Sequence, residues 1–424
     1  MSVTDADIAG PGFINFRLKA DALSELLTRV DTAELGLAAP AEPRTIVVDL
    51  CGVNLAKQMH VGHLRATVIG DTLARTFERL GDKVIRQNHV GDWGLPIAMV
   101  TRKIQAEVDA GRLSLDALTL DDLDRLYRAA QSECSGQGKG LAIAQKFRLG
   151  PKVEAELGAM HDEAMEHLTE AKATLVAIQA HEPAVYAIWQ RIYAVTMGAC
   201  LEACGKLHTR ITEADSAGES SYAEELRQVV DDLSKRGIAE ESDGALVIRL
   251  DSPEDGNIAE PCLIRKSDGG FLYATTDIAA IRRRVQTLGA DRVIYTVDAR
   301  QSLHFRQVFA ATRKAGYATR PGASEPSVLE HAAFGTVLGE DGRPFKTRSG
   351  ENVKLGDLLD QAVERAARTV AAKNPELGEA ERRPIAEAVG IAAIKYADLS
   401  GERIKDYVFS FDRMLAFEGN TGPY

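Results

Sequence analysis

The feature of this sequence that most constrains its fold is a short turn between an apolar run and an amphipathic helical pattern. Residues 45–50 have the length and composition of a buried parallel strand. From residue 64 to residue 80, apolar side chains recur at three- and four-residue spacing, which predicts a helix. The segment between them, residues 54–63, therefore places His60 and His63 at the start of that helix.

A helix start of this kind is suited to an anionic ligand. Its unpaired backbone N–H groups and the helix dipole favour negative charge. Gly62 would let a large ligand approach the backbone, and two imidazoles three positions apart can donate hydrogen bonds to phosphate oxygens. Two surface histidines at an ordinary helix start would give the same pattern, so the phosphate hypothesis depends on the surrounding sequence.

The next segments of the chain predict a parallel sheet. A second strand at 83–90 comes after Gly81, and strand, helix and strand in this order form a right-handed crossover unit. Ligands of such sheets bind at the carboxyl ends of the strands. Besides the two histidines, that rule groups around one crevice the residues Asp49, Cys51, Asn54, Asn88 and His89.

The rest of the chain extends this α/β pattern. Residues 101–240 are mostly helical and polar, and strands are expected at 245–250, 261–265, 291–298 and 331–338, with a helix at 301–314. We predict an α/β fold with a Rossmann-type parallel sheet that is split by a mostly helical insertion. The expected parts are a lead-in that packs on the adjoining chain (1–44), the first sheet half (45–100), a connective insertion (101–270), the second sheet half (271–350) and a C-terminal helical segment (351–424).

Composition limits the location and the partners of the chain. The net charge of −11 does not attract polyanions, so nucleic-acid contact would need a local basic patch. The small clusters at 282–284 and 382–383 are expected on solvated helix faces. No apolar run can span a bilayer and no signal peptide is evident, which predicts a cytoplasmic protein without a membrane partner. Five scattered cysteines fit a reducing compartment, and Cys200 and Cys204 are expected to be helix-face residues rather than metal ligands.

A polar loop near residue 345 is the second candidate for phosphate binding. It spans 339–350 and carries Arg343, Lys346 and Arg348 among three glycines. A flexible basic loop can close over a polyphosphate. Taken alone, the same loop could be a solvated hairpin.

Together these residues resemble the catalytic core of arginyl-tRNA synthetase, a class I aminoacyl-tRNA synthetase. His-Val-Gly-His at 60–63 is similar to the HIGH element of the class, and Lys346-Thr-Arg-Ser-Gly350 stands in the place of the KMSK loop in a degenerate form. Lys57 stands where a lysine is thought to compensate in such family members. Further segments match in family order at 88–94, 218–220, 270–277, 298–301, 395–400 and 417–424.

The resemblance implies ATP-dependent activation of arginine to an aminoacyl adenylate, with Mg²⁺ bound to the ATP rather than held by the protein. Lys57, His60, His63 and Lys346 would be catalytic and supply a positive field, and Gly62 would join them in ATP binding. A guanidinium has five donors and no acceptor, so it needs carboxylates or other oxygens. The residues that resemble the arginine site of the family are Asp49, Asn54, Glu219, Tyr273, Asp277 and Gln301.

Within that set, Tyr273 and Asp277 lie one helical turn apart and resemble the guanidinium site, with Asp49 and Glu219 as acidic neighbours. Asn54 and Gln301 resemble contacts to the α-amino and carboxylate groups. Asp277 alone could simply cap a helix.

The sequence also departs from the family pattern. Cys-Gly-Val-Asn at 51–54 stands where Ser-Pro-Asn or Ser-Ala-Pro-Asn is usual. Glycine relaxes the φ angle that proline fixes, so the loop for the substrate amino group is expected to be reshaped. The resemblance also implies that the helical segment 351–424 contacts the tRNA stem. The chain begins and ends where a domain that touches the tRNA elbow and an anticodon-binding domain would join.

Two hypotheses arise for the acceptor. A truncated synthetase would transfer arginine to the acceptor end of tRNA. A stand-alone paralogue would pass it to a small amine or carrier, without dependence on an anticodon. A catalytically inactive regulatory protein and a nucleotidyl transferase of the same fold class are further alternatives. The intact lysine and histidine elements argue against an inactive regulatory protein. The Tyr273–Asp277 pair argues against a nucleotidyl transferase.

Overall fold

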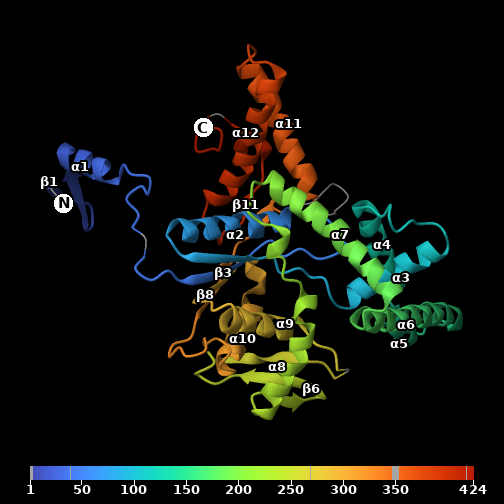
Figure 1. The fold of residues 1–424 in the computed structure, drawn as a ribbon. Helices are drawn as coiled ribbons and strands as arrows, with labels where there is room; N and C mark the ends of the chain where they lie inside the picture. The colour runs from blue at the N-terminus through green and yellow to red at the C-terminus, as the bar shows by residue number, and fades with distance from the viewer. Residues whose placement is uncertain (1–2, 39, 268, 346–352, 417) are drawn as a thin grey trace.

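The centre of the molecule is a four-stranded parallel sheet (Figure 1). The computed structural model describes residues 3–38, 40–267, 269–345, 353–416 and 418–424. The strand order is β4-β3-β8-β9, and every neighbouring pair is parallel. Strands β3 (Thr45–Asp49) and β4 (Lys83–Gln87) come from the first predicted sheet half. Strands β8 (Arg292–Tyr295) and β9 (Val328–His331) come from the second. This arrangement confirms the predicted split sheet.

The central residues of strand β3, 46–48, are apolar and buried because both faces of the sheet are covered. Successive side chains point to opposite faces. Ile46 and Val48 pack in one hydrophobic cluster with helix α2 (Val61–Arg79), whereas Val47 packs in a second cluster with α9 (Tyr273–Arg282) and α10 (Ser302–Lys314). Figure 1 shows α2 on one side of the sheet and α9 and α10 on the other.

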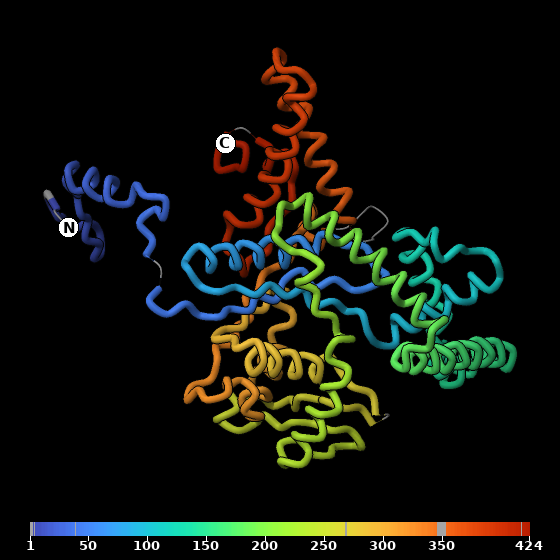
Figure 2. The backbone as a smooth tube through the Cα atoms, viewed as in Figure 1, coloured from blue at the N-terminus to red at the C-terminus, as the bar shows by residue number. Residues whose placement is uncertain are grey.

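The region predicted as one insertion forms two separate parts. Figures 1 and 2 show a group of helices at the side of the central sheet and a small sheet beside α9 and α10. The helical part contains α3 (Leu95–Asp109), α4 (Leu120–Glu133), α5 (Gly138–Phe147), α6 (Pro151–Gln179) and α7 (Pro183–Lys206). The other part contains α8 (Ala223–Lys235) and the antiparallel strands β5 (Glu240–Ser242), β6 (Ala245–Leu250) and β7 (Ile258–Arg265).

Short helical turns lie at the connections between these parts. Three are 3₁₀ helices, at Glu213–Asp215, Glu219–Tyr222 and Ala299–Gln301. Helix α9 continues as a π-helical turn at Arg283–Thr287.

The C-terminal segment is helical, as predicted, and rises from the central sheet as a pair of helices (Figure 1). These are α11 (Leu355–Lys373) and α12 (Glu379–Leu399). Strand β11 (Tyr407–Val408) then pairs in parallel with β10 (Val337–Leu338), and the short helix α13 (Phe411–Met414) comes next. Among the described helices, none combines the length and the apolar character that a bilayer crossing requires.

Two predictions about local structure are wrong. The lead-in was expected to pack on the adjoining chain, yet its hairpin and helix lie apart from the body in Figures 1 and 2. They are β1 (Val3–Ala9), β2 (Phe13–Leu18) and α1 (Ala20–Val30), and α1 has no buried residue.

The strand predicted at 331–338 is broken into the end of β9 and β10. Between them, carbonyl groups of the chain accept hydrogen bonds from the buried Arg65 and the half-buried Arg403 instead of from a neighbouring strand. Arg65 Nη1 donates to the Gly335 carbonyl over 2.7 Å, and Arg403 Nη1 donates to the Ala333 carbonyl over 2.5 Å.

Candidate active site

The two histidines lie at the N-terminus of α2, as predicted. His60 is the N-cap residue, and its Nδ1 accepts a hydrogen bond from the Gly62 backbone N–H over 3.0 Å. His63 Nδ1 accepts from the His60 backbone N–H over 3.1 Å. Each neutral imidazole must therefore carry its proton on Nε2. The rings lie 4.1 Å apart between centroids, so two Nε2–H donors are held close together at the helix start.

The histidines do not carry the positive charge that the resemblance implied. Burial lowers the pKa of His63 to about 3, and the neighbouring His60 adds to that effect. Burial, followed by the charge of Lys57, lowers the pKa of His60. Both rings are neutral near pH 7 and act as hydrogen-bond donors. The nearby charge comes from Lys57, which is exposed and lies 4.5 Å from the centre of the Tyr127 ring.

The chain that follows the basic loop reaches the same turn. Lys346 itself, with the whole stretch 346–352, lies outside the described residues. Directly after that stretch, Val353 accepts a hydrogen bond from the Val61 backbone N–H over 3.0 Å. The Leu355 backbone N–H donates to the Met59 carbonyl over 2.9 Å. The chain that leaves the basic loop therefore lies against the histidine turn.

The loop after β3 pairs with the loop after β4, as the carboxyl-end rule predicts. The Gly91 backbone N–H donates to Val53 over 2.8 Å, and Leu55 donates back to Gly91 over 3.0 Å. Asn54 is exposed on this loop, and a Cβ atom at Gly91 would collide with its Oδ1. Glycine at position 91 therefore leaves room for the Asn54 side chain in its present position.

The departure at 51–54 is visible in the backbone. Cys51 has a φ of 71° and Gly52 has a φ of 66°. Both values lie in the left-handed region, which proline cannot adopt. Gly52 is fixed there by Asn88, whose Oδ1 accepts its backbone N–H over 3.0 Å.

A second group of residues forms an acidic cluster around Glu219 and Asp277. Tyr273 and Asp277 lie one turn apart on α9, as predicted, and Asp277 does not cap the helix because it is the fifth helical residue. Its Oδ2 accepts a hydrogen bond from His304 Nε2 over 2.6 Å. Burial and then the charges of Asp92 and Asp277 raise the pKa of Glu219 to about 8. Burial and then Glu219 raise the pKa of Tyr273, so these side chains share one electrostatic environment.

The position of Glu219 depends on Asp92, which was not among the predicted site residues. The Ser220 backbone N–H donates to Asp92 Oδ1 over 2.8 Å, and the Ser220 hydroxyl donates to Oδ2 over 2.6 Å. This contact holds the turn Glu219–Tyr222 against the end of the β4 loop. Among the described residues, Glu219 has no cationic partner. A half-buried carboxylate of this kind gains from a cationic ligand.

Asp49 is already paired within the protein. It is 5% exposed, and Arg284 Nη2 donates to its Oδ2 over 2.6 Å. Arg284 Nε also donates to Gln87 Oε1 over 2.6 Å. The cluster at 282–284 was expected on a solvated face, but Arg284, on the π-helical turn, is fully buried and bonded to the ends of β3 and β4. Because Arg284 already neutralises Asp49, this carboxylate is not free to bind a second guanidinium.

The remaining predicted residue, Gln301, is exposed at the N-cap of α10, beyond the carboxyl end of β8. Sequence reasoning missed Asp92 and His304. Asp92 lies in the segment 88–94, which already matched the family pattern, so the sequence did contain a signal for it. No local pattern connects His304 with Asp277.

Comparisons with known proteins agree with this geometry. The family described as tRNA synthetases class I (R), catalytic domain, matches residues 26–411. Arginine–tRNA ligase of Shewanella amazonensis is 46% identical over 100% of this chain and 67% of its own length. The Laribacter hongkongensis ligase is 45% identical over 99% and 67%.

Solved structures give the same result. Arginyl-tRNA synthetase from Plasmodium falciparum aligns with a TM-score of 0.75 and 26% identity, over 99% of this chain and 65% of that one. The Thermus thermophilus enzyme has the same fold, with a TM-score of 0.68 and 24% identity over 100% and 68%. This chain thus spans about two thirds of the length of the curated relatives. The chain therefore belongs to the arginine–tRNA ligase family of class I aminoacyl-tRNA synthetases and contains the catalytic domain of that family.

Proposed function

We propose that this chain activates arginine with ATP and transfers the arginyl group to the acceptor end of tRNA. In the first step, an oxygen of the arginine carboxylate attacks the α-phosphorus of ATP and pyrophosphate leaves. In the second step, a ribose hydroxyl of the tRNA end attacks the arginyl carbonyl and AMP leaves. The observation that carries this proposal is a cluster of carboxylates at the same sheet edge as a neutral histidine pair, in which Glu219 has no cationic partner among the described residues.

The acidic cluster suits the guanidinium group of arginine. Glu219 and Asp277 would accept hydrogen bonds from it, with Tyr273 beside them. His304 fixes the Asp277 carboxylate, and Asp92 fixes the turn that carries Glu219. The exposed Asn54 and Gln301 would contact the α-amino and carboxylate groups.

The histidine turn suits the phosphates of ATP. Its Nε2–H donors and the start of α2 would hold phosphate oxygens. Lys57, together with Lys346 of the basic loop, would stabilise the charge that develops as pyrophosphate leaves. Magnesium that arrives with ATP would neutralise further phosphate charge. The protein residues therefore contribute mainly positioning and hydrogen bonding.

The acceptor is assigned to tRNA because the relatives are named arginine–tRNA ligases. The comparisons give no support to a small amine or carrier. The limits predicted for the five parts of the chain, and a role of residues 351–424 in contacting the tRNA stem, stay predictions. A cytoplasmic location is part of the proposal, and the five free cysteine thiols support it.

The test is a pyrophosphate-release assay with each amino acid, without tRNA, with full tRNA, with an acceptor-stem minihelix and with an anticodon-altered tRNA. Arginine should be the preferred substrate, and arginyl-tRNA should form. The anticodon-altered arm tests the predicted independence from the anticodon. The proposal fails if no guanidino amino acid is activated in any arm.

A further inference from the structure

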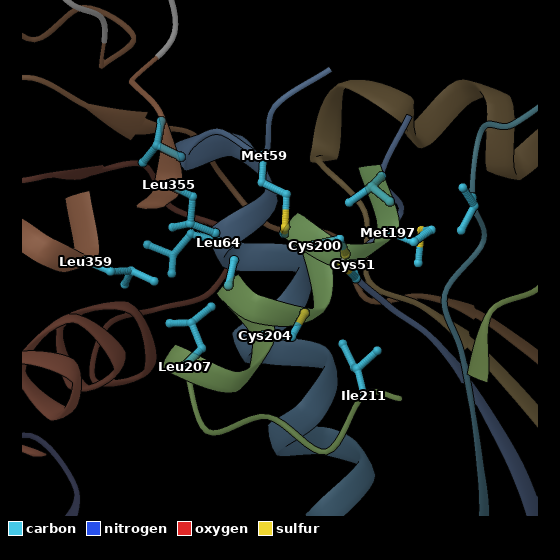
Figure 3. Packing of buried hydrophobic residues seen from close by; sticks show 14 of the residues in the cluster. Cys51, Met59, Leu64, Met197, Cys200, Cys204, Leu207, Ile211, Leu355 and Leu359 are labelled. Carbon is cyan, nitrogen blue, oxygen red and sulfur yellow. Dashed lines mark hydrogen bonds between the residues drawn. The ribbon is translucent and has the colours of Figure 1, made fainter. Parts of the chain in front are cut away.

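Three of the five cysteines meet in the core. Cys200 and Cys204 lie on successive turns of α7, and Cys51 comes after β3 in the loop that leads to Asn54 (Figure 3). Their exposed fractions are 1%, 0% and 2%. The three Sγ atoms all lie within 4.8 Å of one another. The sequence indicated only a helical pair, because Cys51 is 149 residues from Cys200.

The spacing of the sulfur atoms fits a metal ion. A Zn–S bond is about 2.3 Å long, so two sulfurs on one tetrahedral zinc lie about 3.8 Å apart. The Sγ atoms of Cys51 and Cys200 are 3.8 Å apart. Both sides of the cluster are fixed, because Cys51 has a left-handed backbone and the other two share a helix face. Small side-chain shifts from a spread of at most 4.8 Å would bring the three sulfurs onto one ion.

A buried polar group beside the cluster has an unused donor. Asn88 is fully buried, and its Nδ2 has no hydrogen-bond partner although its Oδ1 accepts the backbone N–H of Gly52, the residue after Cys51. A buried N–H group without a partner is available to a sulfur ligand in this loop.

A route to the cluster is also present. A cavity of about 140 Å³ lies between α7 and the histidine turn. Cys200 lines this cavity together with Val53, Lys57, Ala203 and Lys206. Zinc with three thiolates needs a fourth ligand, and a water in this cavity could supply it beside Cys200.

We propose that Cys51, Cys200 and Cys204 bind a single thiophilic d¹⁰ cation, Zn²⁺ or Cu⁺, which ties the substrate loop to α7. Three S–H bonds break, three metal–sulfur bonds form, and the protons pass to solvent without any change of oxidation state. Soft thiolates select these two ions over Mg²⁺. The site is separate from arginine activation and does not depend on the function proposed for the chain.

The experiment measures metal content in the full chain after reduction, chelation and dialysis against Zn²⁺ alone or, in a second anaerobic arm, against Cu⁺ with a competing chelator. We expect one equivalent in one of the two arms, and at least a tenfold loss in Cys51→Ser and Cys204→Ser. The matched controls are Cys134→Ser and Cys262→Ser, which change cysteines outside the cluster and should keep the metal.

A spectroscopic arm needs no variant. Added Co²⁺ should give thiolate-to-cobalt charge-transfer absorption with the intensity of three sulfur ligands. Zinc should also raise the thermal unfolding midpoint of the unmodified chain but not that of Cys51→Ser. Metal retention below one tenth of an equivalent in both arms overturns the proposal. Retention in the two cluster variants equal to that of the unmodified chain, or loss of two thiols to a disulfide in the reduced and dialysed chain, overturns it as well.

Discussion

Replacement of Glu219 by glutamine gives the most direct test of the acidic cluster. Glu219 has a pKa of about 8 because it is buried near Asp92 and Asp277. In the free chain at pH 7 it is therefore mostly protonated. A guanidinium prefers the carboxylate, so arginine binding should release a proton from Glu219 near neutral pH.

The magnitude is set by the ionised fraction. With a pKa of about 8, about 1% of Glu219 is ionised at pH 6 and about half at pH 8. The apparent affinity for arginine should therefore rise by up to about 50-fold over this interval. Isothermal titration calorimetry in buffers of different ionisation enthalpy would measure both the affinity and the released proton. Glu219→Gln should bind arginine weakly at every pH and release no proton.

The same group affects the stability of the free chain. Its folded pKa lies above the ordinary value of 4.5, so it contributes nothing below pH 4.5 and increasingly opposes folding between pH 4.5 and 8. At pH 7 the difference corresponds to about 3 kcal/mol as an upper figure. Without arginine, Glu219→Gln should gain stability relative to the unmodified chain as pH rises through this window, whereas Glu213→Gln, at an exposed position, should not. The reasoning would be refuted if the affinity for arginine did not change with pH. It would also be refuted if Glu219→Gln and Glu213→Gln released the same number of protons on binding arginine.

Three further changes test other parts of the site. Asp277→Asn should weaken arginine binding by about 2–4 kcal/mol with little effect on ATP, because it removes a charged acceptor; unchanged arginine affinity in calorimetry would contradict this role. His63→Ala should lower the rate of adenylate formation in single-turnover assays while arginine binding stays the same, because its Nε2–H contact strengthens as pyrophosphate leaves; a change confined to arginine affinity would move His63 out of the phosphate site. Arg284→Met should cost about 3–5 kcal/mol in denaturant unfolding, because it leaves Asp49 buried without its partner, and a loss below about 1 kcal/mol would show that Asp49 needs no such partner.

The sequence alone determined the local features of this protein. The apolar period of 45–50 and of the helix after it placed His60 and His63 at a helix start, and the structure confirms that position. The order of strands and helices likewise predicted the split parallel sheet. Such features are readable because each depends on residues that are neighbours in the chain.

Only the tertiary structure decided which distant side chains meet. The pairing of Asp49 with Arg284, of Asp277 with His304 and of Cys51 with the cysteines of α7 joins segments that have no local signal in common. Burial also made the histidines neutral, although their positions were predicted correctly. The amphipathic pattern of α1 indicated an apolar face but not a partner for it. Periodicity records which face of an element is apolar, whereas contact partners and protonation states depend on the packing of the whole chain.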